Sequence, residues 1–66
     1  MSLTTRIREY RIRDRMSQEE LAQRVGVRRE TIGNLENGKY NPSLKLAMDI
    51  ARVFGCSVED LFTFSD

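Results

Sequence analysis

Apolar side chains recur along this chain at spacings of three and four residues, which is the mark of one buried helical face. The first set of this kind consists of Leu3, Ile7 and Tyr10. It predicts a helix that is capped by Ser2 or Thr4 and ends near Asp14. No stretch of strict alternation, the pattern of half-buried strands, competes with these spacings. We therefore expect an all-α fold of five helices joined by short loops.

Two short helices separated by a glycine are predicted in the middle of the chain. Ser17 and Glu20 form the pattern of a capping box at the start of a helix over about residues 18–25. Gly26 favours the left-handed conformation that follows a helix end. A third helix is expected over about residues 29–36. The inward-facing residues of these two helices are Leu21, Ala22, Val25, Ile32 and Leu35.

Two further helices are predicted after the stop signal Asn37-Gly38. Ser43 is placed to cap a fourth helix, which Gly55 ends. The apolar positions of that helix are Leu44, Ala47, Met48, Ile50, Ala51 and Phe54. Ser57 and Asp60 form another capping pattern before a short fifth helix. Its apolar positions are Val58, Leu61 and Phe62.

The length and composition restrict the kinds of site that the chain can build. A chain of 66 residues forms one domain at most, over residues 1–66, and its stability depends on helix packing and dimerisation. Its single cysteine, Cys56, excludes an internal disulfide and is expected to pack as a small apolar side chain. The absence of histidine excludes a Cys/His metal site and a Ser-His-Asp triad. We therefore expect no enzymatic activity, no metal and no cofactor.

The apolar runs of the chain are all short. None approaches the roughly 20 residues of a membrane span, and no apolar stretch follows the N-terminal arginines as in a secretory signal. We therefore expect a cytoplasmic protein without a membrane partner.

Charge is distributed unevenly along the chain although the net charge is only +1. Residues 1–29 carry eight arginines and four acidic residues, whereas residues 30–66 carry three basic and six acidic residues. Such a polarised chain suits a protein with one face toward an anion. Alternatively, the arginines of the first helix are simply solvated.

Residues 17–36 place two helices of about two turns each around a glycine-containing turn, as a helix-turn-helix requires. In that motif the second helix enters the major groove of DNA. Over about residues 5–62 the chain resembles the lambda-repressor-like helix-turn-helix family, the Cro and phage-repressor (XRE) type of transcription regulator. The residues that carry the resemblance are Ser17-Gln18-Glu19-Glu20-Leu21-Ala22, Gly26-Val27, Thr31-Ile32, Glu36-Asn37-Gly38-Lys39-Tyr40-Asn41-Pro42-Ser43 and Phe54-Gly55-Cys56-Ser57-Val58-Glu59-Asp60-Leu61-Phe62.

The resemblance implies that one set of residues faces the bases. Its members are Arg28, Arg29, Glu30, Thr31 and Asn34. By chemistry, Arg29 could donate two hydrogen bonds to guanine, and Asn34 could pair with adenine. Glu30 could accept from a cytosine amine or hold Arg29. Each of these side chains could instead be an ordinary exposed group on a short helix.

A second set is implied to contact the DNA backbone. Gln18 begins the second helix, where free amides and the positive end of the helix dipole attract a phosphate. The loop after the third helix would grip phosphates through its side chains and its turn amides. Its residues are Asn37, Lys39, Tyr40 and Asn41.

Other positions are implied to be structural or depart from the family pattern. Arg11 and Glu36 match a family pair, and we expect an ion pair that orients the third helix. Arg15 stands where glycine is common and is either strained or reaches a phosphate. Arg28 stands where serine or threonine usually caps the third helix, and Gly33 lies within that helix at a cost of about 1 kcal/mol.

A single recognition helix touches few base pairs, so we expect a homodimer on a pseudo-palindromic operator of double-stranded DNA. We expect no oligomerisation domain after residue 66, and the candidate interface is therefore predicted within the domain, at Val58, Phe62 and Phe64. Phe62 could instead complete the core of the monomer. The leading hypothesis is a stand-alone, sequence-specific transcriptional regulator, a repressor, whose third helix reads the major groove. The alternative is an antitoxin-like protein-interaction module that neutralises a partner.

Overall fold

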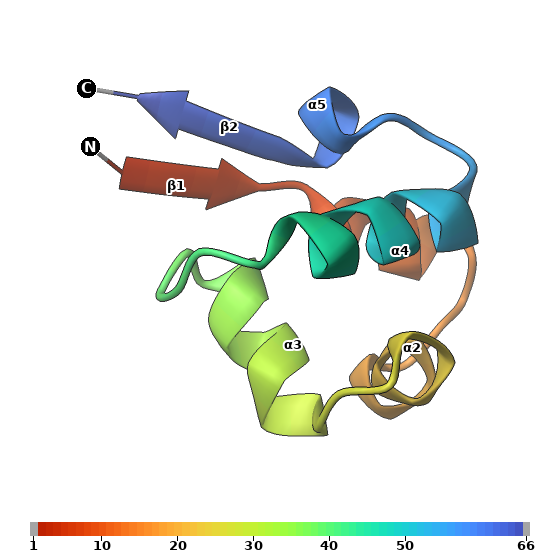
Figure 1. The fold of residues 1–66 in the computed structure, drawn as a ribbon. Helices are drawn as coiled ribbons and strands as arrows, with labels where there is room; N and C mark the ends of the chain where they lie inside the picture. The colour runs from red at the N-terminus through yellow and green to blue at the C-terminus, as the bar shows by residue number, and fades with distance from the viewer. Residues whose placement is uncertain (1, 66) are drawn as a thin grey trace.

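The computed structural model describes residues 2–65, which form five helices and one two-stranded antiparallel sheet (Figure 1). In chain order the elements are β1 (Ser2–Thr5), α1 (Ile7–Arg13), α2 (Gln18–Val25), α3 (Arg29–Glu36), α4 (Leu44–Phe54), α5 (Val58–Leu61) and β2 (Phe62–Ser65). In Figure 1 the strands and α5 lie above α4, whereas α2 and α3 lie below it. The helix pair predicted to bind DNA is therefore at the opposite side of α4 from α5.

The expectation of an all-α fold is wrong at the two ends of the described chain. Leu3, expected on the face of the first helix, lies in β1 opposite Phe64, and Thr5 lies opposite Phe62. Ser2 and Thr4 cap no helix; the Ser2 hydroxyl lies 3.1 Å from that of Ser65. Threonine and phenylalanine favour strands, but each strand has four residues and its partner lies up to 63 residues away. No local pattern reveals such a pairing.

The strands also shift the ends of two predicted helices. The first helix begins only at Ile7, after Arg6, whose side chain makes no capping hydrogen bond. The fifth helix ends at Leu61, and Phe62 is the first residue of β2. The backbone amide of Arg6 donates to the carbonyl of Leu61 at 2.8 Å, which ties the end of β1 to the start of β2.

The remaining helix ends follow their predicted signals. The hydroxyls of Ser17 and Ser43 accept from amides three residues later, at 3.0 and 3.1 Å. Ser57 and Asp60 form a complete capping box. The pattern at the start of α2 is only half formed, because the carboxylate of Glu20 pairs with Arg24 instead. Gly26 and Gly55 both end helices in the left-handed region, at φ 75° and 67°.

Arg15 adopts a strained backbone in the turn between α1 and α2. Its φ is 54°, and it is the only residue other than glycine with a positive φ among those described. A left-handed conformation costs a side-chain-bearing residue roughly 1–2 kcal/mol. The position therefore has the geometry that explains why glycine is common there in the family that the sequence resembles.

The core lies between the helices and extends under the two-stranded sheet. Its largest fully buried side chains are Ile7, Leu21, Ile32, Leu35, Ile50 and Leu61. The predicted apolar face of α4 is too wide, because Leu44 is 73% exposed and Met48 is 41% exposed. Cys56 packs against the core, and burial raises the pKa of its thiol, with a smaller contribution from the carboxylate of Asp60.

Within residues 2–65, no helix has the length and apolar character needed to cross a membrane.

Candidate nucleic-acid interface

The helix pair α2 and α3 is fixed by a left-handed glycine and by two buried side chains. Gly26 ends α2 at φ 75°, and the next amide, that of Val27, donates back to the carbonyl of Ala22 at 3.0 Å. Ile32 and Leu35 are fully buried and anchor α3 to the core. The opposite side of α3 is therefore held outward.

The predicted base-facing set lies on this outward side, with one exception. Arg28, Arg29, Glu30 and Asn34 are exposed. Thr31 is half-buried, so only part of its side chain is accessible to a ligand. Arg28 takes the capping position of α3 without a side-chain hydrogen bond, so its guanidinium is not used to close the helix end.

Gly33 also lies on α3, and the fold does not require a glycine there. A Cβ at this position would meet only the amide nitrogen of Gln18, at an ordinary 3.9 Å. The residue has a helical backbone rather than a positive φ. The missing side chain therefore makes the surface of α3 less bulky at this position, and it relieves no internal clash.

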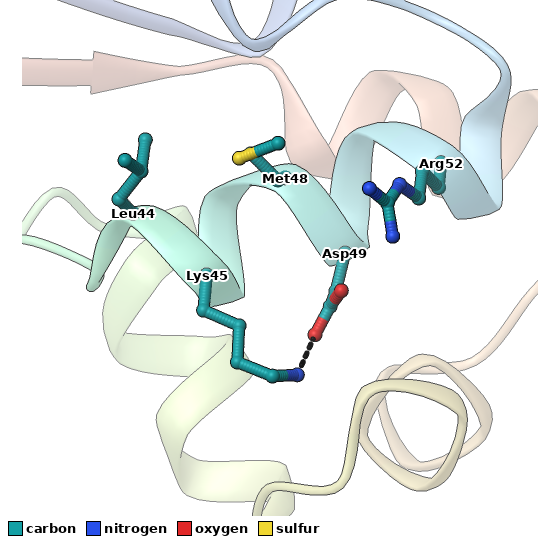
Figure 2. A pocket seen from close by; sticks show the side chains of 5 residues that line it. All are labelled: Leu44, Lys45, Met48, Asp49 and Arg52. Atoms are coloured by element: carbon teal, nitrogen blue, oxygen red, sulfur yellow. Dashed lines mark hydrogen bonds and ion pairs between the residues drawn. The ribbon is translucent and has the colours of Figure 1, made fainter.

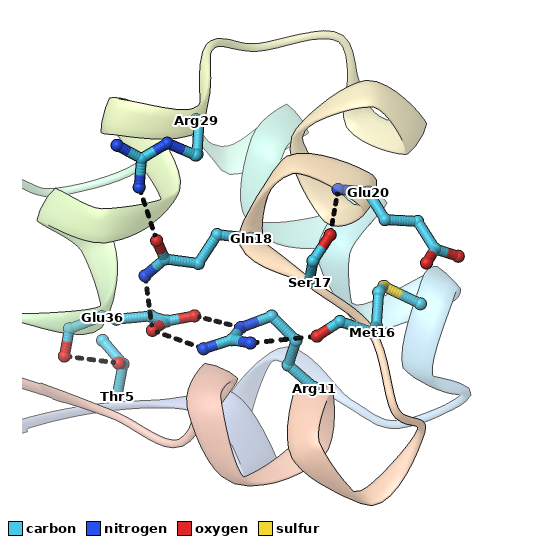
Figure 3. Close-up of polar contacts among 8 residues, drawn as sticks. All are labelled: Thr5, Arg11, Met16, Ser17, Gln18, Glu20, Arg29 and Glu36. Atoms are coloured by element: carbon cyan, nitrogen blue, oxygen red, sulfur yellow. Dashed lines mark hydrogen bonds and ion pairs between the residues drawn. The ribbon is translucent and has the colours of Figure 1, made fainter.

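A hydrogen-bonded chain of side chains connects α1 to the outer face of α3 (Figure 3). Its inner part is the ion pair of Arg11 with Glu36, at 2.8 and 3.2 Å, and Arg11 also donates to the carbonyl of Met16 at 2.9 Å. The side chains of the ion pair are only 13% and 7% exposed. The end of α3 is thus fastened to α1 and to the turn before α2.

The outer part of this chain runs through Gln18. Its amide nitrogen donates to Glu36 at 3.1 Å, and its amide oxygen accepts from Arg29 at 3.0 Å. Gln18, the predicted phosphate ligand, is therefore also the link between the buried ion pair and the predicted base-reading arginine. It retains one N–H to donate, since an amide nitrogen carries two hydrogens.

Glu30 does not hold Arg29, which was one of the two roles suggested for it. Arg29 donates to Gln18 instead. Within residues 2–65, Glu30 forms no hydrogen bond or ion pair through its side chain and is exposed. Its carboxylate is therefore free to accept hydrogen bonds from a ligand, and it repels any phosphate that comes near.

The loop from residue 37 to residue 41 presents side chains, but its first amides are already used. The amides of Asn37, Gly38 and Lys39 donate to carbonyls of α3 at 2.9 to 3.1 Å. The expectation that turn amides grip phosphate is therefore wrong for these three, because they satisfy the last carbonyls of the helix. It stays a prediction for the amides of Tyr40 and Asn41. The side chains expected there are all exposed: Asn37, Lys39, Tyr40 and Asn41.

The predicted dimer residues lie on a different surface, between the two-stranded sheet and α4. Val58 and Phe62 are half-buried and pack against the core, whereas Phe64 is 51% exposed. They line one apolar groove together with Leu3, Pro42, Leu44 and Ala47. Leu44 was predicted to lie on the buried face of the fourth helix, although its place directly after the cap Ser43 puts it in the first turn, where a side chain has few neighbours.

A second shallow pocket adjoins this groove through Leu44 (Figure 2). Leu44 and Met48 point to one side of α4, and Lys45 and Asp49 point to the other, where they form an ion pair at 2.7 Å. The exposed apolar surface therefore continues along α4 from the two-stranded sheet, with charged side chains at its border.

Comparison with known proteins places most of the chain in one family. Residues 7–61 match the model of the helix-turn-helix family. An HTH-type transcriptional regulator of Archaeoglobus fulgidus is 66% identical over 64 residues, which cover 97% of this chain and 91% of that protein. A regulator of the same description from Methanothermobacter thermautotrophicus is 51% identical, over 97% of this chain and 94% of its own.

Two solved structures have a similar fold. A protein of Bacteroides fragilis shares the fold, with a TM-score of 0.81 at 21% identity over 92% of this chain and 98% of that chain. The restriction-modification controller protein C.AhdI of Aeromonas hydrophila has a TM-score of 0.76 at 33% identity, over 83% of both chains. The chain therefore belongs to the lambda-repressor-like helix-turn-helix family, a family of DNA-binding transcription regulators.

Proposed function

We propose that this protein represses transcription by binding a specific duplex sequence with α3 in the major groove. The observation that carries the proposal is the two-sided character of α3. Ile32 and Leu35 are fully buried, while Arg29 and Asn34 project into solvent from the other side. An α-helix fits the major groove, where each base pair presents a distinct set of donors and acceptors.

Base recognition falls to Arg28, Arg29, Glu30 and Asn34 in this proposal, with Thr31 at the edge of the contact. Arg29 suits guanine best, because Gln18 holds its guanidinium while other N–H groups remain to donate. Glu30 suits a cytosine amine, because it is an acceptor without an internal partner among the described residues. Repression then needs no additional surface, since a protein bound across a promoter blocks access to it.

Backbone contacts come from two places on either side of α3. Gln18 has a spare N–H at the start of α2, where the helix dipole favours an anion. The exposed side chains of Asn37, Lys39, Tyr40 and Asn41 form the second contact. Such phosphate contacts set the register of α3 in the groove without selecting a sequence.

The protein would act as a homodimer, and we assign the apolar groove between the two-stranded sheet and α4 to a second copy of the chain. Phe64 and Leu44 are 51% and 73% exposed there, and Met48 extends the same surface. Burial of an apolar patch of this kind is the usual basis of an interface. Two copies would place two α3 helices on half-sites about one helical turn apart.

Binding-site selection from random duplexes at two salt concentrations tests the function. The parent should enrich a short pseudo-palindrome, and Arg29→Ala should lose the preference at one base pair of each half-site. Arg6→Ala is the matched control, since this exposed arginine lies at the start of α1, where its backbone meets α5. No enrichment with the parent, or identical preferences for Arg29→Ala and the parent, would contradict the proposal.

The dimer is tested by sedimentation of Phe64→Asp and the parent at micromolar concentration. A charge in the groove should convert the dimer to a monomer with little loss of stability, because Phe64 is half exposed in the single chain. Thr63→Asp is the control, because it places the same charge on the neighbouring exposed residue of β2. A parent that sediments as a monomer, or an unchanged Phe64→Asp dimer, would exclude this interface.

A further inference from the structure

Strand β1 lies directly against the end of α3 and the loop that follows it. The hydroxyl of Thr5 donates to the backbone carbonyl of Glu36, the last residue of α3, at 3.4 Å. Gly38 approaches the same strand so closely that a Cβ there would collide with the carbonyl oxygen of Leu3. Around Gly26 and Gly55, by contrast, a Cβ would find open space. The contact between the loop and β1 is therefore a specific feature of this part of the fold.

The side of the loop that carries the proposed phosphate ligands also faces the two-stranded sheet. Lys39, Tyr40 and Asn41 line one hollow together with Ser2, Leu3 and Phe64. β1 is itself held in place by β2, with Leu3 opposite Phe64 and Thr5 opposite Phe62. The loop therefore rests on a two-stranded support that is fixed to the core through Leu61, since β2 follows this buried residue directly.

We infer that the two-stranded sheet is a positioning element for DNA binding, which holds the loop where its side chains meet the phosphodiester backbone. Thr5 and Gly38 are the positioning residues: one fixes the end of α3, and the other allows the loop to lie against β1. This inference rests on the proposed function, in which Lys39, Tyr40 and Asn41 bind phosphate. A preordered loop binds more tightly because it loses less conformational freedom when the ligand arrives.

The variant Thr5→Val tests the inference, because it removes the hydroxyl and keeps a β-branched side chain that suits a strand. Thr4→Val is the matched control, because it makes the same change at the preceding residue of β1, which is exposed. The measurement is the dissociation constant for the selected operator and for a random-sequence duplex over a salt series. Thermal stability and dimer content are measured in parallel.

Thr5→Val should weaken binding to both duplexes by about 3- to 10-fold, which corresponds to one net hydrogen bond. The slope of log affinity against log salt should become shallower by up to about 0.9, since one phosphate contact is weakened. The ratio of operator to random-sequence affinity should stay constant, and Thr4→Val should match the parent. An unchanged salt slope for Thr5→Val, or an equal effect of Thr4→Val, would overturn the inference.

A double-mutant cycle separates positioning from a general loss of stability. The effects of Thr5→Val and Lys39→Gln on binding should be non-additive, because both act through the same loop, whereas those of Thr5→Val and Arg29→Ala should add. Additive effects in both cycles would overturn the positioning role. If Lys39→Gln alone binds with the affinity and salt slope of the parent, the loop is no phosphate site, and the proposed site fails together with this inference.

Discussion

Arg11 donates two hydrogen bonds to the carboxylate of Glu36, at 2.8 and 3.2 Å, and the two side chains are almost completely buried. Removal of one partner from a buried ion pair leaves an uncompensated charge, which costs about 3–5 kcal/mol. We expect Glu36→Gln to lose stability of this order in denaturant unfolding. The exposed pair of Arg24 with Glu20 is the control, and Arg24→Gln should cost less than about 1 kcal/mol. Equal effects of the two variants would contradict a structural role for the buried pair.

Gln18 should affect DNA recognition more than it affects the fold. Gln18→Met keeps the length of the side chain but releases Arg29 from its hydrogen bond of 3.0 Å. We expect a modest loss of stability, about 1 kcal/mol, and a severalfold loss of discrimination at the base that Arg29 contacts. Gln23→Met, a change at an exposed glutamine of the same helix, should leave discrimination unchanged. Competition binding with single-base operator variants measures this, and full discrimination by Gln18→Met would refute the role.

Two glycines with similar backbones should respond differently to alanine. Gly38 and Gly55 have φ of 68° and 67°, so both alanine variants carry the strain of a left-handed residue, roughly 1–2 kcal/mol. Gly38→Ala also forces a Cβ against the carbonyl of Leu3, whereas the space at Gly55 is open. We expect Gly38→Ala to cost about 1–3 kcal/mol more than Gly55→Ala in chemical denaturation. Similar costs for both would mean that β1 and the loop separate easily.

The capping box of α5 should make stability depend on pH in acid. The amide of Ser57 donates to the carboxylate of Asp60 at 3.0 Å, and this hydrogen bond lowers the pKa of Asp60 below its usual 3.8. A depressed folded pKa means that the stabilisation is present above pH 3.8 and is lost as the pH falls through the lower value. The melting temperature of the parent should exceed that of Asp60→Asn near neutral pH, and the gap should close toward pH 2. A pH-independent gap for Asp60→Asn would contradict the prediction.

Away from the two strands, local signals in the sequence predicted the helix ends, because each signal depends on residues within one turn. Ser17, Ser43 and Ser57 accept the expected amide hydrogen bonds, and Gly26 and Gly55 have the expected left-handed backbone. The two-stranded sheet could not be predicted in this way. Its stability comes from pairing two four-residue strands at opposite ends of the chain, and neither strand is long enough to show an alternating pattern.

The candidate site was predictable to the extent that helical periodicity decides exposure. Arg29 and Asn34 are exposed because Ile32 and Leu35 occupy the other side of α3. The hydrogen bond from Arg29 to Gln18 spans two helices and depends on how they pack, so the sequence does not reveal it. The same holds for the support of the loop by β1, because it depends on the pairing of β1 with β2.

The proposal that α3 recognises bases in the major groove is tested most directly by paired changes in the protein and in the DNA. Replacing the guanine assigned to Arg29 with 7-deazaguanine removes one major-groove acceptor and leaves base pairing intact. We expect this change to weaken binding of the parent by about 1 kcal/mol or more, which is roughly fivefold, and to leave binding of Arg29→Ala unchanged. An equal loss for both proteins, or no loss for the parent at any guanine of the operator, would contradict the proposal.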